Sequence, residues 1–312
     1  MLRMKQTDAE DRATSQSAPL LRPTALAWPG WIPLLGLPVA TMALRSRLAP
    51  WRFMWMLAVA IFLGCKWQTW WEQRRIVEIG IGRTLGYLFL WPGMDAETFL
   101  DSARRARRPI IREWIWASIK TASGGGLLWG AVRRVPEGSD LLAGWVGMLG
   151  IILILHFGAF HILSLAWRSA GVDAPPIMLA PLSSASLSDF WGRRWNLGFR
   201  HLTHRLIFTP VRIRAGVVPA ILLSFLASGV IHDMVISLPA RGGYGLPTGY
   251  FVLQGLGVLI ERSPLGKRFG VGSGIRGWLW AVTFAGAPAC ILFHPPFVRG
   301  VILPFLNAIG AR

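Results

Sequence analysis

One histidine, His232, lies inside a stretch of sequence that is otherwise apolar. No Asp, Glu, Lys or Arg occurs between Arg214 and His232. A helix that starts near Pro219 places His232 about 20 Å along its axis, because each residue adds about 1.5 Å. Ionisable side chains are costly inside a membrane, so this one favours a functional role, and an imidazole suits proton transfer at neutral pH. The structural alternative is a histidine that only bridges two helices by hydrogen bonds.

Small and polar residues surround this histidine at helical spacing. Ser224, Ser228 and His232 recur every four residues and therefore share one helix face. Gly229 keeps the neighbouring surface small, which permits either a cavity or a close helix contact. Asp233 follows directly and is expected either to pair with a cation or to lie near the far interface. We expect Ser228 and Asp233 to contact the substrate.

Other reaction types find little support in the residue pattern. A metal centre of the membrane di-iron type needs clustered histidines and carboxylates, and only His201 and His204 share a helical face, among arginines. No CxxC pair, G-x-S-x-G elbow or P-loop is present. We therefore expect no metal and no bound cofactor. The chemistry is left to His232 and a polar partner. The six histidines are His156, His161, His201, His204, His232 and His294.

A second candidate segment covers residues 186–206. Ser186 and Asp189 have the spacing of a capping box, which predicts a helix start. Aromatic and aliphatic residues then fall on one face and basic residues on the other, so we expect an amphipathic helix on the cytoplasmic membrane surface. A mere membrane anchor is the alternative. The apolar face holds Trp191, Trp195, Phe199, Leu202 and Leu206, and the basic face Arg193, Arg194, Arg200, His201, His204 and Arg205.

The composition indicates the environment in which these segments fold. The chain of 312 residues is 53% hydrophobic and only 15% charged, whereas roughly 25% is usual for soluble domains. We expect an all-α polytopic transmembrane helical bundle of about six to eight spans, each needing about 20 apolar residues. Residues 301–309 are too short to span and are expected in the interface. The candidate spans are residues 31–44, 53–65, 141–167, 216–238, 244–260 and 277–297, with weaker ones at 79–91 and 114–132.

The formal charge of +18 is explained by loops that flank the spans, so a nucleic-acid partner is not expected. By the positive-inside rule, the clusters at 104–112, 193–214 and 261–276 face the cytoplasm, and the link at 239–243 lies opposite. We expect a multi-pass protein of a bacterial-type inner membrane. Residues 1–20 are predicted to be a disordered tail, and residues 21–312 a single membrane-embedded domain. Glycines 124–126 predict a break or hinge in a weak span.

Two segments together resemble a known family. The sequence L-S-D-F-W-G-R-R-W-N at 187–196, followed by S-G-V-I-H-D at 228–233, is similar to the wax-synthase-like branch of the membrane-bound O-acyltransferase superfamily. The W-P-G-M element at 91–94 also resembles an upstream element of these proteins. The resemblance extends over roughly residues 80–270. It departs from the family at Asp233, where relatives often have Glu.

The resemblance implies a reaction that suits these residues. Transfer of an acyl group from acyl-CoA to an alcohol requires a base for the hydroxyl proton, which implies a catalytic role for His232. It implies that Asn196 polarises the acyl carbonyl or donates to the developing oxyanion. By the expected topology Asn196 lies at the surface and His232 lies deep. The two therefore share a site only if the 191–205 helix dips into the bundle or a funnel penetrates the bundle.

The implied substrates are acyl-CoA, as co-substrate, and a hydrophobic alcohol or other hydroxyl acceptor from the bilayer. Trp191 and Trp195 are expected to bind substrate. Arg193, Arg194, Arg200 and Arg205 are expected to contact the phosphates of CoA, with anionic lipid headgroups as the alternative partner. Residues 21–312 would then form one O-acyltransferase domain. Two alternatives stay open: O-acetylation of a sugar or cell-envelope polymer, and a non-catalytic transporter or scaffold.

Overall fold

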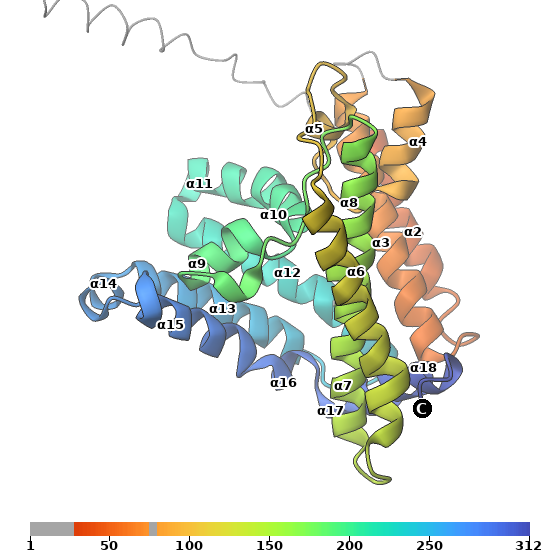
Figure 1. Cartoon of the computed structure of the whole chain (residues 1–312). Coiled ribbons are helices and arrows are strands. Elements are labelled where there is room, and N and C mark those ends of the chain that lie inside the picture. The colour runs from red at the N-terminus through yellow and green to blue at the C-terminus, as the bar shows by residue number, and fades with distance from the viewer. Residues whose placement is uncertain (1–27, 75–79) are drawn as a thin grey trace, which may run out of the picture.

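The computed structural model describes residues 28–74 and 80–312. Throughout these ranges the regular elements are helices and no strand is found, so the expected all-α fold is confirmed (Figure 1). The tail predicted at 1–20 lies outside the described residues. The expectation of a single domain over residues 21–312 stays a prediction.

The first described helices are α2 (Ile32–Met42), α3 (Pro50–Gln73) and α4 (Ile81–Leu90). At about 1.5 Å per residue, neither α2 nor α4 is long enough to cross a bilayer core of about 30 Å on its own. Helix α3 has 24 residues but carries three charged side chains, at Arg52, Lys66 and Glu72. The candidate span at 53–65 therefore lies within a longer helix, and those at 31–44 and 79–91 form short helices.

The next helices form an antiparallel hairpin, which stands upright in Figure 1. After the short α5 (Ala96–Leu100), α6 (Ile111–Gly125) continues through π-helical and 3₁₀ turns to Arg134. Helix α7 (Asp140–Ile152) continues through a π-helical turn into α8 (Phe160–Ser169). Of the break or hinge predicted at 124–126, the break does not occur, but the helix changes there from α-helical to π-helical turns. Gly124 instead allows close packing, since a Cβ there would lie 2.8 Å from the Gly150 carbonyl oxygen.

Three helices are long and apolar enough to cross a membrane: Asp140–Ser169, Val217–Ala240 and Gly274–Leu292. They match the spans expected at 141–167, 216–238 and 277–297, and they support an integral membrane protein. Between the last two lies α13 (Leu246–Arg262) of 17 residues. The total of six to eight spans stays a prediction. The second span is α12 (Val217–Ala240), and the third combines α15 (Gly274–Gly286) with α16 (Ala289–Leu292).

The single amphipathic helix predicted at 186–206 is wrong. The structure has α9 (Leu187–Asp189) with a π-helical turn to Arg194, then α10 (Leu197–Thr203), a further π-helical turn and α11 (Thr209–Ala215). The chain breaks at Asn196, which adopts a left-handed conformation with φ of 44°. Asparagine tolerates this conformation better than most residues because its side chain bonds locally. The break lets α10 leave the direction of α9.

The expected capping box forms only in part. Ser186 Oγ accepts from the Asp189 N–H at 3.0 Å. The Asp189 carboxylate does not return a bond to the Ser186 N–H. It accepts from the Ala185 N–H at 3.0 Å instead. The capping-box spacing of Ser186 and Asp189 identified the helix start correctly, but it did not reveal the other partners of Asp189.

The C-terminal elements pack into the protein core. Directly after α17 (Pro295–Phe297), residues 298–308 form a π-helical turn and α18 (Leu303–Ala308). Helix α14 (Pro264–Phe269) comes earlier, between α13 and α15. Val301 and Leu306 are fully buried, and Leu306 fills the space beside Gly147 of α7. Protein therefore covers most of these apolar side chains, and the interfacial position expected for 301–309 stays a prediction.

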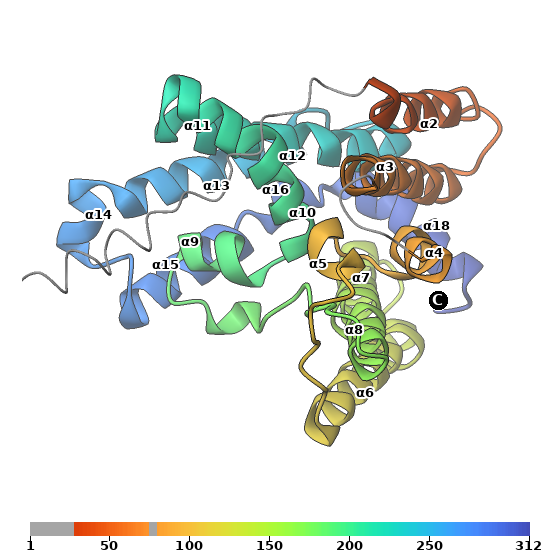
Figure 2. The ribbon, with the colours of Figure 1, turned by 90° about the horizontal axis from the view of Figure 1, so that it is seen from above.

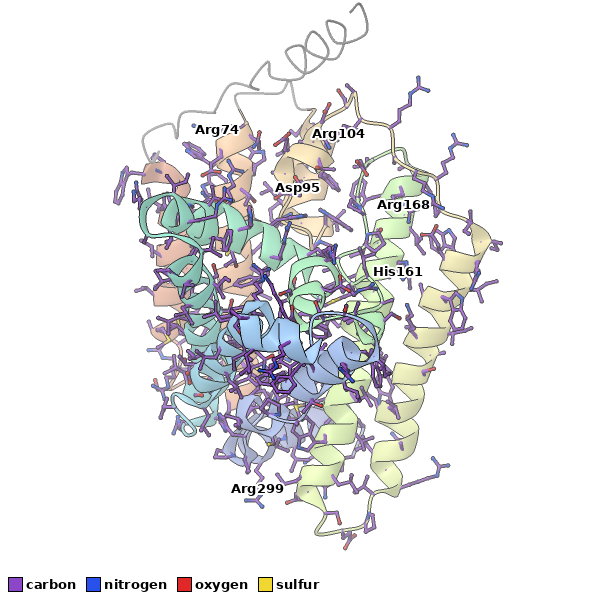
Figure 3. All side chains as sticks on the ribbon, turned by 90° about the vertical axis from the view of Figure 1, so that its left-hand side faces the viewer. Arg74, Asp95, Arg104, His161, Arg168 and Arg299 are labelled. Carbon is purple, nitrogen blue, oxygen red and sulfur yellow. The ribbon has the colours of Figure 1, made fainter. Side chains whose placement is uncertain are left out.

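Figures 1 and 2 show which helices lie at the centre of the molecule. Helices α12 and α13 run side by side in both views, and α10 lies near the middle (Figure 2). Figure 3 shows Arg74, Arg104 and Arg168 toward one end of the upright helices and Arg299 at the other. Assignment of the first end to the cytoplasm stays a prediction.

Candidate active site

His232 is held in a defined tautomer by its own helix. Its Nδ1 lies 2.7 Å from the carbonyl oxygen of Ser228, one turn earlier in α12. A carbonyl oxygen only accepts hydrogen bonds, so Nδ1 must carry the proton and Nε2 keeps its lone pair. The ring also packs on Phe251 of α13, with 4.3 Å between ring centroids. His232 is thus oriented with a free basic nitrogen.

The serines on the same face are satisfied by their helix. Ser224 Oγ donates to the Ala220 carbonyl at 2.7 Å, and Ser228 Oγ donates to the Ser224 carbonyl at 3.0 Å. Gly229 lies against α13, where an added Cβ would be 2.7 Å from Thr248 Cα. The glycine therefore permits the helix contact, and the serine face is left to line a cavity.

Asn196 caps the first turn of α10. Its Oδ1 accepts from the Phe199 N–H at 3.2 Å, and its own N–H contacts Met178 Sδ at 3.2 Å. The capping bond fixes which end of the amide is oxygen, since only oxygen can accept there. No hydrogen bond from the NH₂ group is found within the described ranges. That group is available to a ligand.

His232 and Asn196 line one cavity of about 340 Å³, a size in the range of about 300–1,000 Å³ typical of ligand sites. The chain changes direction at Asn196, and the π-helical turn that follows α10 packs on α12. The remaining lining is mainly aromatic and aliphatic, with a polar and basic minority. It consists of Ser188, Trp191, Gly192, Trp195, Phe199, Arg200, Thr203, His204, Phe208, Ile221, Ser224, Phe225, Ser228, Phe251, Val258 and Arg262.

Three of the six residues predicted to bind substrate line this cavity: Trp191, Trp195 and Ser228. Two of the others, Arg193 and Arg194, do not. Their Nε atoms lie 2.8 and 2.6 Å from the Asp189 carboxylate. Burial raises the pKa of Asp189, but hydrogen bonds from Arg194 and the Ala185 N–H outweigh it and leave the pKa below its ordinary value. The arginine pair thus braces α9 and does not face the cavity.

Asp233, the sixth residue predicted to bind substrate, accepts hydrogen bonds from the turn between α12 and α13. Its carboxylate accepts from the Gly245 N–H at 2.9 Å, the Thr248 N–H at 3.1 Å, and the Thr248 and Ser237 hydroxyls. The first turn of a helix has N–H groups without helical partners, and an anion satisfies them well. The predicted substrate contact of Asp233 is therefore replaced by capping of α13.

Several lining residues were missed by sequence reasoning. Phe251 and Arg262 come from α13, where nothing local marks them, and Arg262 Nε donates to Ser188 Oγ at 3.2 Å. Arg200, by contrast, belongs to the basic face seen in the sequence and does reach the cavity. Of the four arginines expected at the CoA phosphates, Arg200 therefore lines the cavity, together with Arg262, which was not expected.

The W-P-G-M element at 91–94 packs on the start of α10. A Cβ on Gly198 would lie 3.3 Å from Gly93 Cα. The fully buried Lys66 of α3 donates to the Gly93 carbonyl at 2.6 Å. This explains the Lys inside α3: it satisfies a loop carbonyl that supports α10 two residues beyond Asn196.

Glu261 joins α13 to the start of α9. Its carboxylate, only 6% exposed, accepts from the Leu187 N–H at 2.6 Å and the Ser188 N–H at 3.3 Å. Trp191 Nε1 adds a bond to Gln254 Oε1 at 3.2 Å. Helix α13 therefore fixes α9, and with it the aromatic wall of the cavity.

Replacing Glu261 with Gln is expected to lower the free energy of unfolding by about 1–2 kcal/mol, because the anion at two unpaired N–H groups is lost. The measurement is the thermal transition of the purified protein in detergent. Glu137→Gln is the matched control, since Glu137 is exposed in the turn before α7. Equal transitions for the two variants would show that Glu261 is not a structural cap.

Among the residues that the structure describes, no group of three or more His, Cys, Asp or Glu side chains is arranged to hold a metal ion. The expectation that the chemistry needs no metal or cofactor stays a prediction.

Comparison with known proteins agrees with this arrangement. Residues 174–253 match the model of the membrane bound O-acyl transferase family, a range that contains both Asn196 and His232. A probable long-chain-alcohol O-fatty-acyltransferase 7 of Arabidopsis thaliana is 30% identical over 158 residues, 46% of this chain and 43% of the relative. The long-chain-alcohol O-fatty-acyltransferase of Simmondsia chinensis is 33% identical over 106 residues, 31% of this chain and 30% of the relative.

A further relative, probable long-chain-alcohol O-fatty-acyltransferase 3 of Arabidopsis thaliana, is 27% identical over 177 residues, 48% of this chain and 51% of the relative. The chain thus spans about half the length, or less, of the curated relatives that it matches. The resemblance to the wax-synthase-like branch of the membrane-bound O-acyltransferases is confirmed over the matched part.

Proposed function

We propose that this chain, whose central segment matches the membrane-bound O-acyltransferases, transfers an acyl group from acyl-CoA to the hydroxyl of a lipophilic alcohol. The observation that carries the proposal is the cavity that His232 and Asn196 share. A base with a free ring nitrogen and an amide with a free NH₂ are the two groups that acyl transfer to an alcohol requires. The names of the matched relatives suggest long-chain alcohols as acceptors.

The reaction follows from the two groups. His232 Nε2 removes the hydroxyl proton as the alcohol oxygen bonds to the thioester carbonyl carbon. The Asn196 NH₂ donates to the oxyanion that develops. When the carbon–sulfur bond breaks, the proton returns from the imidazolium to the CoA sulfur. Ester and free CoA leave, and His232 is again neutral.

The lining supports these substrates. Its aromatic and aliphatic side chains suit an acyl chain and a fatty alcohol, since burial of apolar surface stabilises them. Arg200 and Arg262 provide cations for the phosphates of CoA, because guanidinium groups match phosphate geometry. With the basic loops in the cytoplasm, the donor would enter from that side.

The test uses the purified protein in phosphatidylcholine vesicles with a fatty acyl-CoA and a fatty alcohol. We expect ester, detected by mass spectrometry, together with one free CoA per ester. Transfer from acetyl-CoA to a sugar polymer, without fatty ester, would favour the cell-envelope alternative. Release of no CoA by folded protein with any acceptor would contradict an acyltransferase and favour a transporter or scaffold.

A further inference from the structure

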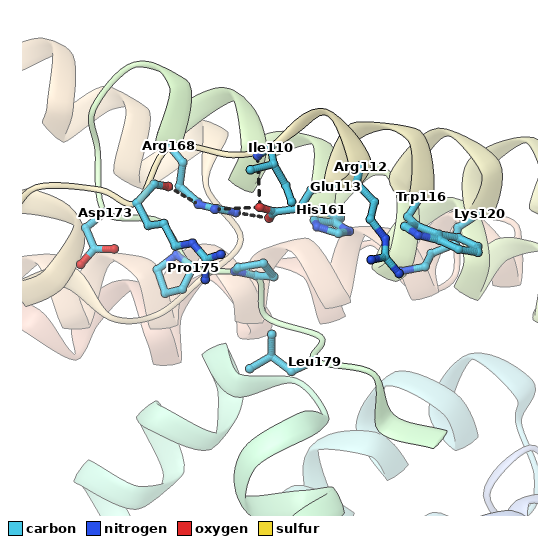
Figure 4. A pocket seen from close by; sticks show the side chains of 12 residues that line it. Ile110, Arg112, Glu113, Trp116, Lys120, His161, Arg168, Asp173, Pro175 and Leu179 are labelled. Atoms are coloured by element: carbon cyan, nitrogen blue, oxygen red, sulfur yellow. Dashed lines mark hydrogen bonds and ion pairs between the residues drawn. The ribbon is translucent and has the colours of Figure 1, made fainter. Parts of the chain in front are cut away.

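A second cavity lies between α6, α8 and the loop at residues 173–179. It has a volume of about 570 Å³ and is separate from the cavity of His232. Four cationic side chains and two carboxylates line it (Figure 4). The cations are Arg107, Arg112, Lys120 and Arg168, and the carboxylates are Glu113 and Asp173. The groove is strongly basic, and nothing in the proposed reaction uses it.

One of these cations is committed to the fold. Arg168, only 6% exposed, forms a two-point ion pair with Glu113, at 2.6 and 3.2 Å (Figure 4). Its Nε also donates to the Arg107 carbonyl at 2.9 Å. The pair ties α8 to α6 and neutralises both charges. It therefore builds the wall of the groove and leaves little charge for a ligand.

The other cations have no such partner. Within the described ranges, no ion pair or hydrogen bond is found for the side chains of Arg107, Arg112 or Lys120. Arg112, Trp116 and Lys120 follow each other at four-residue spacing, so they form one stripe on α6 that faces the groove (Figure 4). Asp173 lies at the opposite end from Lys120 (Figure 4). The stripe thus carries two cations without a carboxylate partner among the described residues.

The neighbours of Lys120 favour a lipid over a soluble anion. Lys120 lies eight residues beyond Arg112, about 12 Å farther along α6. Next to the cationic stripe, Ile111, Ile115 and Ile119 are exposed on α6. A ligand that satisfies both surfaces needs an anionic group joined to apolar chains. A phospholipid supplies the phosphate to the cations and acyl chains to the isoleucines.

We propose that this groove binds an anionic phospholipid, with its phosphate between Arg112 and Lys120 and its acyl chains along the exposed isoleucines of α6. Backbone hydrogen bonds connect the groove to the segment that lines the first cavity. Leu179 lines the groove, and its N–H donates to the Arg194 carbonyl at 2.8 Å. The Leu197 N–H donates to the Ile177 carbonyl at 2.9 Å in the same loop. Lipid in the groove thus supports the segment that carries Asn196.

The test measures lipid retention and is independent of any catalytic activity. The protein is purified in neutral detergent, phosphatidylglycerol or phosphatidylcholine is added, and bound lipid is counted by native mass spectrometry. The variant is Arg112→Gln with Lys120→Gln. The matched control is Arg105→Gln with Arg108→Gln, which removes two charges from the same basic region at exposed positions outside the groove.

We expect wild type and control to retain phosphatidylglycerol over phosphatidylcholine and the groove variant to bind it about tenfold more weakly. Thermal transitions of both variants in detergent should nearly match, because among the described residues Arg112 and Lys120 form no ion pair or hydrogen bond, and Lys120 has only a distant cation–π contact, 5.8 Å from the centre of the Phe157 ring. Equal retention by groove variant and control would overturn the proposal. Displacement of phosphatidylglycerol from wild type by free CoA would also overturn it, since the cations would then serve the phosphates of CoA.

Discussion

Replacement of His232 with Asn is expected to reduce the turnover of acyl transfer by about 10²- to 10⁴-fold, the usual contribution of a general base. Asparagine keeps an N–H donor near the place of Nδ1, so it can still donate to the Ser228 carbonyl. It has no basic nitrogen at the position of Nε2. The variant should therefore fold and insert like wild type and fail in chemistry. Turnover is measured as the rate of CoA release with acyl-CoA and alcohol in excess over the enzyme. Folding is measured as the thermal transition.

Ser228→Ala is the matched control for this loss. It removes the hydroxyl but leaves the main-chain carbonyl that accepts the hydrogen bond from His232 Nδ1. Because that hydroxyl donates to the Ser224 carbonyl at 3.0 Å, it has no free proton for a substrate. Turnover should change by less than about tenfold. A Ser228→Ala loss as large as that of His232→Asn would indicate that the serine face, and not the imidazole, supports the reaction.

Replacement of Asn196 with Asp is expected to lower turnover by about 10²- to 10³-fold, the usual effect of removing one oxyanion donor. Aspartate caps a helix about as well as asparagine and also tolerates the left-handed conformation. The N–H of Phe199 keeps an acceptor, so stability should stay near that of wild type. The NH₂ donor is lost, and a negative charge takes its place beside the developing oxyanion. The rate and the thermal transition are measured on the same preparation.

Asn196→Ala separates the two roles of this residue. It removes the cap, at about 1 kcal/mol, and places a non-polar side chain in a left-handed conformation, at about 1–2 kcal/mol. Alanine should therefore lower both the transition and the rate, whereas aspartate lowers the rate alone. If Asp supports wild-type turnover, Asn196 is only a helix cap, and the oxyanion must be stabilised by another group.

The parts of the fold that could be predicted are those fixed by one continuous run of sequence. The span at 141–167 and the placement of His232 beside Ser228 follow from apolar length and four-residue spacing, and both are found. The break at Asn196 could not be predicted from periodicity, because the apolar spacing continues across it. Its cause is one residue's conformation, supported by Phe199 and by the loop at 91–94.

Asp233 and Arg193 have protein partners that the sequence pattern did not reveal, and the physical reason is the same for both. A charged side chain beside a motif suggests a substrate partner, but unpaired N–H groups and nearby carboxylates compete for the same charge. Asp233 is taken by the start of α13, and Arg193 by Asp189. The residues that replace them beside the cavity, such as Arg262, come from a helix far along the chain. Only the packing of α13 on α9 and α12 identifies them.

The most direct test of the account is to locate the substrate in the cavity that His232 and Asn196 share. The wild-type protein in vesicles is irradiated with a fatty acyl-CoA that carries a photoreactive diazirine in its chain, and labelled peptides are identified by mass spectrometry. We expect labels within residues 191–208 and 221–262, suppressed by excess unlabelled acyl-CoA. Labels confined to the groove between α6 and α8, with none on α10, α12 or α13, would contradict it.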